Sequence, residues 1–253
     1  MPLRHLERYN TSPNLRRRLG SRAERDFLEL NSMTVSGLED DFQGDTLSGT
    51  YQSTASGAAS AAAAISTGVV NGAILLDAGT DNAGRCDLSW GLHYQGQLNP
   101  VYIARFSINT ITTRKFEIGF TDVISGTDAG AVNAKATPTF TATDCAVLVY
   151  DTDDDALLTL VGNANGTAAT VADFSIALVA ATYYYFGVAL IGTGAHGFVL
   201  DANGALLERQ EITAAVTTDV LLTPWLFVQN RAGNAGTMTV DWHRAYQRRT
   251  TTD

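Results

Sequence analysis

From about residue 36 onward, short apolar segments with a period of two recur, separated by Gly, Asn and Asp. Because alternate side chains of an extended chain point to opposite faces, this pattern indicates half-buried β-strands. Residues 101–108 (VYIARFSI) and 116–120 (FEIGF) show the pattern most clearly. Further segments of this kind are 145–150, 157–161, 183–191, 197–201, 205–212, 220–229 and 237–246. Strands of this length and spacing predict one all-β domain over residues 36–250, an antiparallel β-sandwich or barrel.

Two dipeptides predict tight hairpins inside this domain. Asn203 and Gly204 stand between two apolar segments, and Asn71 and Gly72 form a second such pair. Both residue types tolerate a positive φ, which two-residue hairpin turns require. Residues 55–68 consist mostly of Ala, Ser, Gly and Thr. Although alanine favours helix, this segment lies between strand-like pieces, so it is predicted to be a small-residue strand and turn.

Alternation also assigns side chains to faces in the final strand-like segment. It places two triplets on opposite sides: Met238, Val240 and Trp242 on one, and Thr239, Asp241 and His243 on the other. We therefore expect Asp241 and His243 to meet in an ordinary surface contact.

The aromatic run at residues 183–186 is the one place where alternation suggests a binding surface. Tyr184 and Phe186 point one way and are expected in the core, while Tyr183 and Tyr185 point the other way. Aromatic rings suit the apolar faces of pyranose sugars. Tyr183 and Tyr185 are therefore the candidates for contact with a glycan.

Residues 1–35 form a segment of a different kind, here called the arm. Ser12 and Pro13 are typical of a helix start, and Gly20 of a helix end. A second short helix is predicted to begin at Ser21, with Glu24 completing a capping box. Neither helix is long enough to be stable alone in water. The arm must therefore lie on its own sandwich or on a partner.

The arm is basic and the rest of the chain is acidic. Residues 1–30 hold seven arginines and four acidic side chains, whereas the other 223 residues hold 10 basic and 22 acidic ones. A basic arm on an acidic body is typical of a docking segment. The residues predicted to dock into an acidic, partly apolar groove of a partner are Leu15, Arg16, Arg17, Arg18, Leu19, Arg22, Arg25, Phe27 and Leu30. The alternative is that these helices cover an open edge of their own sandwich.

Charge and hydropathy exclude two partner classes. The acidic body would repel nucleic-acid phosphates, so no nucleic-acid partner is expected. No apolar run approaches the roughly 20 residues of a membrane-spanning helix, so no membrane span is expected. The first residues also lack the apolar core of a signal peptide, which argues against classical secretion.

The order of the segments carries a family resemblance. The relevant stretches are 40–47 (DDFQGDTL), 101–106, 116–122, 183–188, 198–204, 222–231 and 238–242. Taken together, they resemble the concanavalin A-like lectin/glucanase (LamG-like) jelly roll, in the form found in bacteriophage virion structural proteins. The resemblance covers roughly residues 40–248.

This resemblance implies a non-enzymatic structural protein of a phage virion, either a capsid decoration or a head or tail accessory protein. The arm would anchor it to other virion proteins of the capsid or tail, and such proteins often form homo-oligomers such as trimers. The alternative is a carbohydrate-binding adhesion module that recognises host-surface glycans.

Catalysis is not expected, because the family's hydrolytic motif is missing. The glucanases of this family place two glutamates and an aspartate on alternate residues of one strand. Here Glu117 is the only acidic residue of its strand, and Glu208 and Glu211 are three apart and so face opposite ways. A retaining glycosidase needs two carboxyl groups about 5–5.5 Å apart. The sequence therefore predicts neither catalytic residues nor an organic cofactor.

The most acidic run offers a candidate metal site. Asp151, Asp153 and Asp155 follow an apolar strand, and alternate aspartates can supply oxygen ligands to Ca²⁺, as in many sandwich lectins. The favoured interpretation is a solvated hairpin turn, because turns collect aspartate for backbone reasons.

The remaining metal-binding and redox residues form no motif. The four histidines are scattered, so no zinc site is predicted. Cys86 and Cys145 provide neither a disulfide framework nor a metal spacing. One bridge between them is conceivable from sequence, but two buried thiols are the favoured interpretation.

Overall fold

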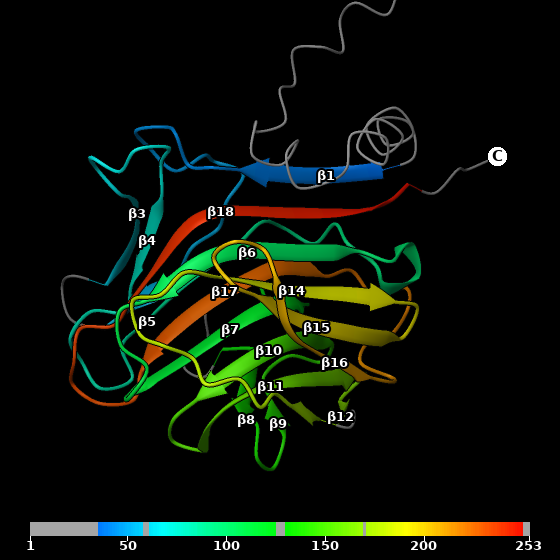
Figure 1. Cartoon of the computed structure of the whole chain (residues 1–253). Helices are drawn as coiled ribbons and strands as arrows, with labels where there is room; N and C mark the ends of the chain where they lie inside the picture. Colours follow the sequence, from blue (N-terminus) through cyan, green and yellow to red (C-terminus); the bar gives the residue numbers. More distant parts are fainter. Residues whose placement is uncertain (1–34, 58–60, 125–129, 169–170, 250–253) are drawn as a thin grey trace, which may run out of the picture. The chain divides into compact units, whose positions relative to one another are not determined.

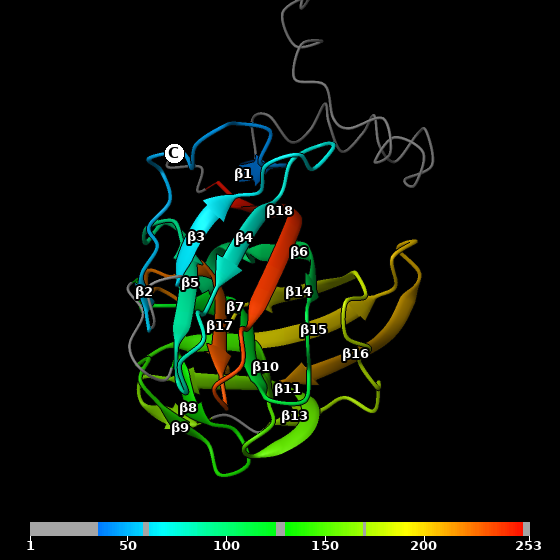
Figure 2. The ribbon, with the colours of Figure 1, turned by 90° about the vertical axis from the view of Figure 1, so that its left-hand side faces the viewer.

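The computed structural model describes residues 35–57, 61–124, 130–168 and 171–249. Residues Gly37–Gln247 form one compact unit, built from antiparallel strands in two facing sheets (Figures 1 and 2). Apart from the 3₁₀ turn η2 (Gly96–Leu98), the described part of this unit contains no helix. The predicted all-β antiparallel sandwich is therefore confirmed. The predicted docking side chains of the arm lie outside the described residues.

The first sheet, sheet A, contains eight strands, seven of them in the order β16-β15-β14-β6-β18-β4-β3, while β1 pairs with β18. Their bounds are β1 Val35–Asp40, β3 Ala62–Ile65, β4 Ile74–Asp77, β6 Val101–Ile108, β14 Tyr184–Ile191, β15 Gly194–Leu200, β16 Leu206–Ile212 and β18 Thr237–Arg248. Burial alternates along β6 and β15, as expected when one face of a sheet covers the core and the other faces outward.

The second sheet, sheet B, also contains eight strands, in the order β12-β11-β10-β7-β17-β5-β2, with β13 pairing to β11. Their bounds are β2 Ala55–Ser56, β5 Arg85–Ser89, β7 Arg114–Thr121, β10 Cys145–Asp151, β11 Asp155–Ala164, β12 Thr167–Ala168, β13 Ala172–Asp173 and β17 Thr223–Asn230. In contrast to β6, every residue of β7, β10 and β17 is buried. Both faces of the middle of sheet B are therefore covered.

The main core lies between the two sheets and is rich in aromatic rings. Phe106 and Phe186 of sheet A stack with centroids 4.5 Å apart, and Phe116 of sheet B packs edge-on against both. The expected inward orientation of Phe186 is confirmed, because only 2% of this residue is exposed.

A second, smaller core covers the other face of sheet B. The segment after β7 returns over the sheet as the hairpin of β8 (Val132–Ala134) and β9 (Thr139–Phe140). Val132 packs there with Trp225 and Phe227 of β17 and with Val147 of β10, and all four side chains are buried. The alternating sequence of β7 did not predict that both of its faces are covered. The β8–β9 hairpin buries the polar side chains of the second face as well as the apolar ones.

Both predicted Asn-Gly hairpins are present. Asn71 and Gly72 have φ values of 73° and 76° in the turn between β3 and β4. Gly204, with a φ of 84°, lies in the turn between β15 and β16. The described part of the segment at residues 55–68 forms the short strands β2 and β3, as its small residues were predicted to do.

The expected surface contact between Asp241 and His243 is wrong, because β18 contains a β-bulge. The register shifts between Val240, which pairs with Phe106, and Trp242, which pairs with Arg105. The extra residue, Asp241, reverses the alternation beyond it. His243 therefore points into the core and is fully buried, while Trp242 points outward.

Inside the core, His243 belongs to a directed chain of hydrogen bonds. The hydroxyl of Tyr51 donates to Oδ2 of Asp40 at 2.7 Å, so its oxygen accepts from Nε2 of His243 at 2.8 Å. Nδ1 of His243 is then the acceptor for the Tyr102 hydroxyl at 3.4 Å. Trp90 stacks on the imidazole with ring centroids 4.4 Å apart. Burial lowers the pKa of His243 to about 3, so the ring is neutral at ordinary pH.

Candidate functional site

The bulge in β18 places two consecutive side chains on the outside of sheet A. Asp241 and Trp242 are both half-buried, whereas Val240 before them and His243 after them are fully buried. A regular strand would have turned one member of this pair into the core. Bulges commonly re-aim side chains at functional sites. The bulge therefore marks the outside of sheet A as the candidate binding surface.

Cross-strand pairing brings three aromatic rings around one ion pair there. Trp242 lies opposite Arg105 of β6, and Arg105 lies opposite Tyr185 of β14. The guanidinium carbon of Arg105 is 4.3 Å from the ring centroid of Tyr183 and 5.8 Å from that of Tyr185. Its Nη1 donates to Oδ2 of Asp241 at 2.5 Å. We call these five residues the aromatic face.

The neighbouring side chains hold the aromatic face in place. The ring of Tyr185 meets that of Trp242 with centroids 6.4 Å apart and the planes at 67°. Nε1 of Trp242 donates to Oε1 of Glu39 at 2.9 Å, which fixes the indole ring against β1. Oε2 of Glu39 is 3.8 Å from Nε of Arg244, so this second cation also lies beside a carboxylate.

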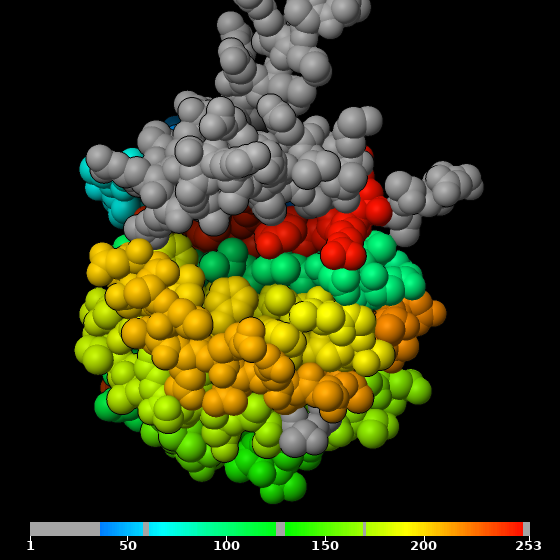
Figure 3. Space-filling view, turned by 45° about the vertical axis from the view of Figure 1, so that its right-hand side comes forward, coloured from blue at the N-terminus to red at the C-terminus, as the bar shows by residue number. Residues whose placement is uncertain are grey.

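Beside the aromatic face, a glycine leaves room for one more aromatic ring on the outside of sheet A. Gly187 of β14 lies opposite Phe198 of β15, and a Cβ atom on Gly187 would lie 2.2 Å from the phenyl ring. Only glycine therefore lets Phe198 lie across the strand. Figure 3 shows the surface over β14, β15 and β16 in yellow to orange. The aromatic face thus continues across Gly187 to the ring of Phe198.

This arrangement suits a neutral, hydroxyl-bearing ligand. Tyrosine and tryptophan rings offer apolar faces for stacking together with a polar edge. Arg105 and Asp241 offer charged donors and acceptors, which form the stronger hydrogen bonds. Among the described residues, the two cations beside the rings each lie next to a carboxylate, Arg105 with Asp241 and Arg244 with Glu39, so the local charge is balanced. A charged ligand gains no net attraction from such a surface.

The alternation of residues 183–186 predicted part of this site. Tyr183 and Tyr185 were the candidate glycan contacts, and the structure places both rings against Arg105 on the aromatic face. Their role in binding stays a prediction. Sequence reasoning missed Trp242, because it assumed an unbroken strand. No signal in the sequence marked the bulge, because Met238, Val240 and Trp242 continue one apolar alternation, whereas the buried positions shift from even (238 and 240) to odd (243 and 245).

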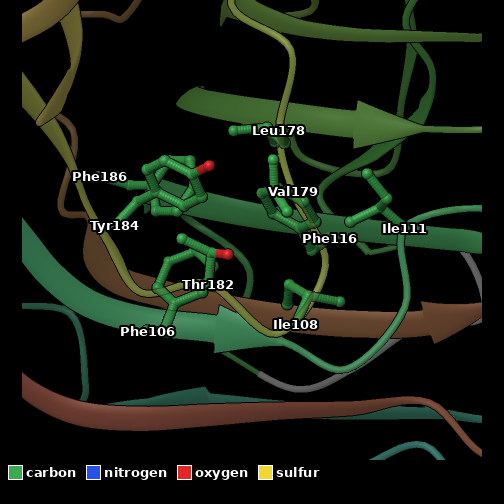
Figure 4. A pocket seen from close by; sticks show the side chains of 9 residues that line it. All are labelled: Phe106, Ile108, Ile111, Phe116, Leu178, Val179, Thr182, Tyr184 and Phe186. Atoms are coloured by element: carbon green, nitrogen blue, oxygen red, sulfur yellow. The ribbon is translucent and has the colours of Figure 1, made fainter. Parts of the chain in front are cut away.

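The small cavity found among the described side chains between the sheets is too small for a ligand. One cavity of about 10 Å³ lies between the sheets, and Figure 4 shows the side chains around it. Its lining is almost entirely aromatic and aliphatic, with only the hydroxyl groups of Thr182 and Tyr184 as polar atoms. A space of this size barely holds one water molecule, and an apolar lining leaves it dry.

Glu117, the glutamate of β7, is engaged in structure. It is fully buried under the β8–β9 hairpin, with Oε1 3.1 Å from Nζ of Lys115. Oε2 accepts from Nε1 of Trp225 at 2.9 Å and from the backbone N–H of Ala131 at 2.8 Å. Oε1 also accepts from the backbone N–H of Val132 at 3.2 Å. A carboxylate so enclosed does not reach a substrate.

Asp151 and Asp153 of the predicted calcium site share one cation, Arg231, and Asp155 lies beside another, Lys135. Asp151 is buried and accepts two hydrogen bonds from the guanidinium of Arg231, while Asp155 is paired with Lys135. Asp153 is exposed on the turn between β10 and β11. In the described part of the chain, no group of three His, Cys, Asp or Glu side chains is placed to hold a metal ion. All three carboxylates thus lie beside cations of the chain itself.

The two cysteines lie apart in the fold. Cys86 belongs to the core between the sheets, and Cys145 to the second core under the β8–β9 hairpin. Both are free thiols. Burial raises the pKa of Cys86 to about 12 and that of Cys145 well above its ordinary value. Neither thiol is therefore suited to nucleophilic chemistry.

Comparisons with known proteins establish the fold. No family profile and no curated protein matches the chain. Among solved structures, the Emp47p carbohydrate recognition domain is similar with a TM-score of 0.59 and 11% identity, over 86% of this chain and 98% of that one.

Two further similar structures have different sources. The winged bean acidic lectin, solved with methyl-α-D-galactose, gives a TM-score of 0.56 and 9% identity over 85% of this chain and 100% of that one. The CBM2 module of an evolved Dit from Lactobacillus casei BL23 phage J-1 gives a TM-score of 0.51 and 7% identity, over 87% of this chain and 99% of that one.

In the described residues, no helix has the length and apolar character needed to cross a membrane. The chain has the lectin-like jelly-roll fold.

Proposed function

We propose that this chain is a carbohydrate-binding module that acts without catalysis and binds a neutral glycan on the aromatic face. The observation that carries the proposal is the meeting of three aromatic rings around the charge-balanced pair of Arg105 and Asp241. The fold supports it as well, since two structures with this fold are named for carbohydrate recognition or solved with a sugar.

In this proposal, one pyranose ring lies with its C–H face against Tyr185 and Trp242. The hydroxyl groups at its edge then accept hydrogen bonds from Arg105 and donate hydrogen bonds to Asp241. Because the cations of this surface lie beside carboxylates, the ligand is a neutral hexose and not a sulfated or uronic sugar.

Removing the stacking surface tests the proposal directly. An array of neutral oligosaccharides first identifies the ligand that binds most strongly, and calorimetry then measures its dissociation constant. The double variant Tyr185→Ala/Trp242→Ala should weaken binding at least about tenfold. Tyr183→Phe keeps its ring and should bind nearly as well as the parent. The measurement is the dissociation constant, with the melting temperature followed alongside to separate loss of contact from loss of fold.

The matched control removes an aromatic ring elsewhere. Phe140 is half-buried on the β8–β9 hairpin, which covers the far face of sheet B, so Phe140→Ala should leave the dissociation constant unchanged. Equal binding by the parent and by the Tyr185→Ala/Trp242→Ala variant would contradict the proposed site. Absence of any glycan ligand would contradict the proposed function.

A second candidate function is that of a structural protein of a phage virion, with residues 1–35 as docking arm and residues 36–250 as the sandwich. Two observations favour it: the basic composition of the arm, and the similarity of the sandwich to a module of a phage Dit. In this role the chain binds other virion proteins of the capsid or tail and assembles as a homo-oligomer such as a trimer.

Charge reversal in the full chain tests the second candidate. Particles that lack this protein should co-sediment with the parent chain but lose it, by about tenfold or more, when Arg16, Arg17 and Arg18 are all changed to Glu. Changing the same three residues to Lys keeps the charge and should keep most of the binding. Equal co-sedimentation of the parent and the Glu variant would show that the arm does not dock.

A further inference from the structure

A cleft of about 590 Å³ lies away from the inter-sheet core, between residues 42–45 after β1 and the β3–β4 hairpin at residues 65–72. Both segments are seen beside β3 and β4 in Figure 2. The floor of the cleft is fixed. Phe42 is buried and packs on the imidazole of His243 with ring centroids 4.8 Å apart. Gly72 lies so close that a Cβ on it would be 2.3 Å from the carbonyl oxygen of Phe42.

The rims of the cleft carry polar side chains that the described structure does not use. Asp45 stands on one rim, and Ser66, Thr67 and Asn71 belong to the opposite segment. Within the described residues, the side chains of these four make no hydrogen bond or ion pair, although each can make at least one. They are therefore available to a ligand.

The hairpin tip beside these polar groups exposes aliphatic surface. Val69 lines the cleft and is 43% exposed, and Val70 next to it is 83% exposed. Turn residues are usually polar or glycine, so two adjacent exposed valines are unusual at such a position. The cleft thus combines hydrogen-bonding groups with an aliphatic wall.

The charge of the lining narrows the class of ligand. Asp45 is the one ionisable side chain among the described lining residues, and none of them is Lys, Arg or His. An anion such as a phosphate, a sulfate or a uronic acid would meet only a carboxylate there. A single carboxylate is also too few for Ca²⁺, which takes six to eight oxygen ligands. A neutral molecule with several hydroxyl groups and an apolar face fits the lining, and a volume of about 590 Å³ lies in the range of small-molecule sites.

We propose that this cleft is a saccharide-binding site in its own right, separate from the aromatic face. One neutral pyranose residue is held there, its hydroxyl groups bound by Asp45, Asn71 and the Ser66 and Thr67 hydroxyls, with its C–H face against Val69. The proposal goes beyond the function proposed above, because it uses none of the residues of the aromatic face.

The test is a ¹H–¹⁵N NMR titration of the full chain with glucose, galactose, mannose and N-acetylglucosamine, each used alone. A single sugar residue on a shallow site binds weakly, with a dissociation constant on the order of millimolar. At least one of the four sugars should shift the backbone amides of Gly44 and Gly68 and the side-chain amide of Asn71. The indole N–H signal of Trp242 reports on the aromatic face in the same spectra.

Variants identify the groups that bind. Asp45→Ala should raise the dissociation constant of the sugar about tenfold, because a hydrogen bond to a charged group is stronger than one between neutral groups. Asn71→Gly removes the side chain but keeps a residue that tolerates the positive φ of this turn. Asn203→Gly, in the other Asn-Gly hairpin, is the matched control and should leave the dissociation constant of the sugar unchanged.

The outcomes separate the two sites. Shifts at the cleft that need about ten times more sugar in Asp45→Ala support the proposal, whether or not the Trp242 indole signal moves. Shifts confined to Trp242 and its neighbours would overturn the cleft site while supporting the aromatic face. No cleft shift with any of the four sugars would overturn it, as would a response to methylammonium but to no sugar.

Discussion

Glu117→Gln should lower the free energy of unfolding by about 3–5 kcal/mol, because it removes the negative charge that lies beside the buried Lys115 ammonium. Neither side chain of this pair has any exposed surface. Glu117 also binds Trp225 Nε1 and two backbone N–H groups at the start of β8. An amide in its place carries no charge and offers one carbonyl oxygen to donors that now share two carboxylate oxygens.

Urea denaturation measures this loss. The matched control is Glu211→Gln, which removes an exposed carboxylate next to Arg209 and should change the free energy by no more than about 0.5 kcal/mol. If the β8–β9 hairpin detaches from sheet B before the rest unfolds, the slope of the denaturation curve will fall together with its midpoint. A loss below about 1 kcal/mol for Glu117→Gln would mean that the hairpin is held mainly by its apolar contacts.

The second large effect is a loss of stability in acid caused by His243. Its pKa is about 3 in the folded chain, against an ordinary value near 6.5 in the unfolded chain. Above pH 6.5 the ring is neutral in both states and adds no pH dependence. As the pH falls below 6.5, only the unfolded chain takes up the proton, so stability decreases until the folded ring also protonates near pH 3. Between pH 7 and pH 4 this single group should cost about 3 kcal/mol.

Urea denaturation of the parent and of His243→Phe, repeated from pH 7 to pH 4, isolates this contribution. The variant is expected to be less stable at pH 7, because Tyr102 loses its acceptor and Tyr51 loses the donor to its oxygen. Its free energy of unfolding should nevertheless fall less steeply as the pH decreases, because the variant lacks the imidazole. The carboxyl groups are common to both chains, so their contribution cancels in the difference between the two curves. Parallel curves for the two chains would show that the imidazole is protonated in the folded state well above pH 3.

The strands and hairpins were predictable because their signals are local. The alternation of residues 101–108 coincides with β6, and the positive φ values of Asn71 and Gly72 explain why that dipeptide marks a turn. The burial of Lys115 and Glu117 was not predictable in this way. It depends on a segment 14–17 residues further along folding back over sheet B, and no local pattern encodes that contact.

The candidate site likewise has a part that local sequence predicted and a part that depends on contacts between distant strands. Tyr183 and Tyr185 follow from the alternation of residues 183–186 at the start of β14, so sequence reasoning named both. Arg105 and Asp241 join them only through pairing between strands that are more than 50 residues apart in the chain. A pattern along one strand does not give its neighbours in the sheet, and the bulge removed even the correct face for Trp242.

The bulge makes Asp241 a supernumerary residue of β18, because it has no partner of its own on β6. A chain without it would have an unbroken strand, in which Val240, Trp242 and His243 would still be buried, outward and buried in turn. The hydrogen-bond chain of the core and the indole of the aromatic face would both persist, and only the carboxylate beside Arg105 would be missing. In evolutionary terms, a single insertion or deletion is enough to add or remove the acidic group of the outer surface while the interior stays unchanged.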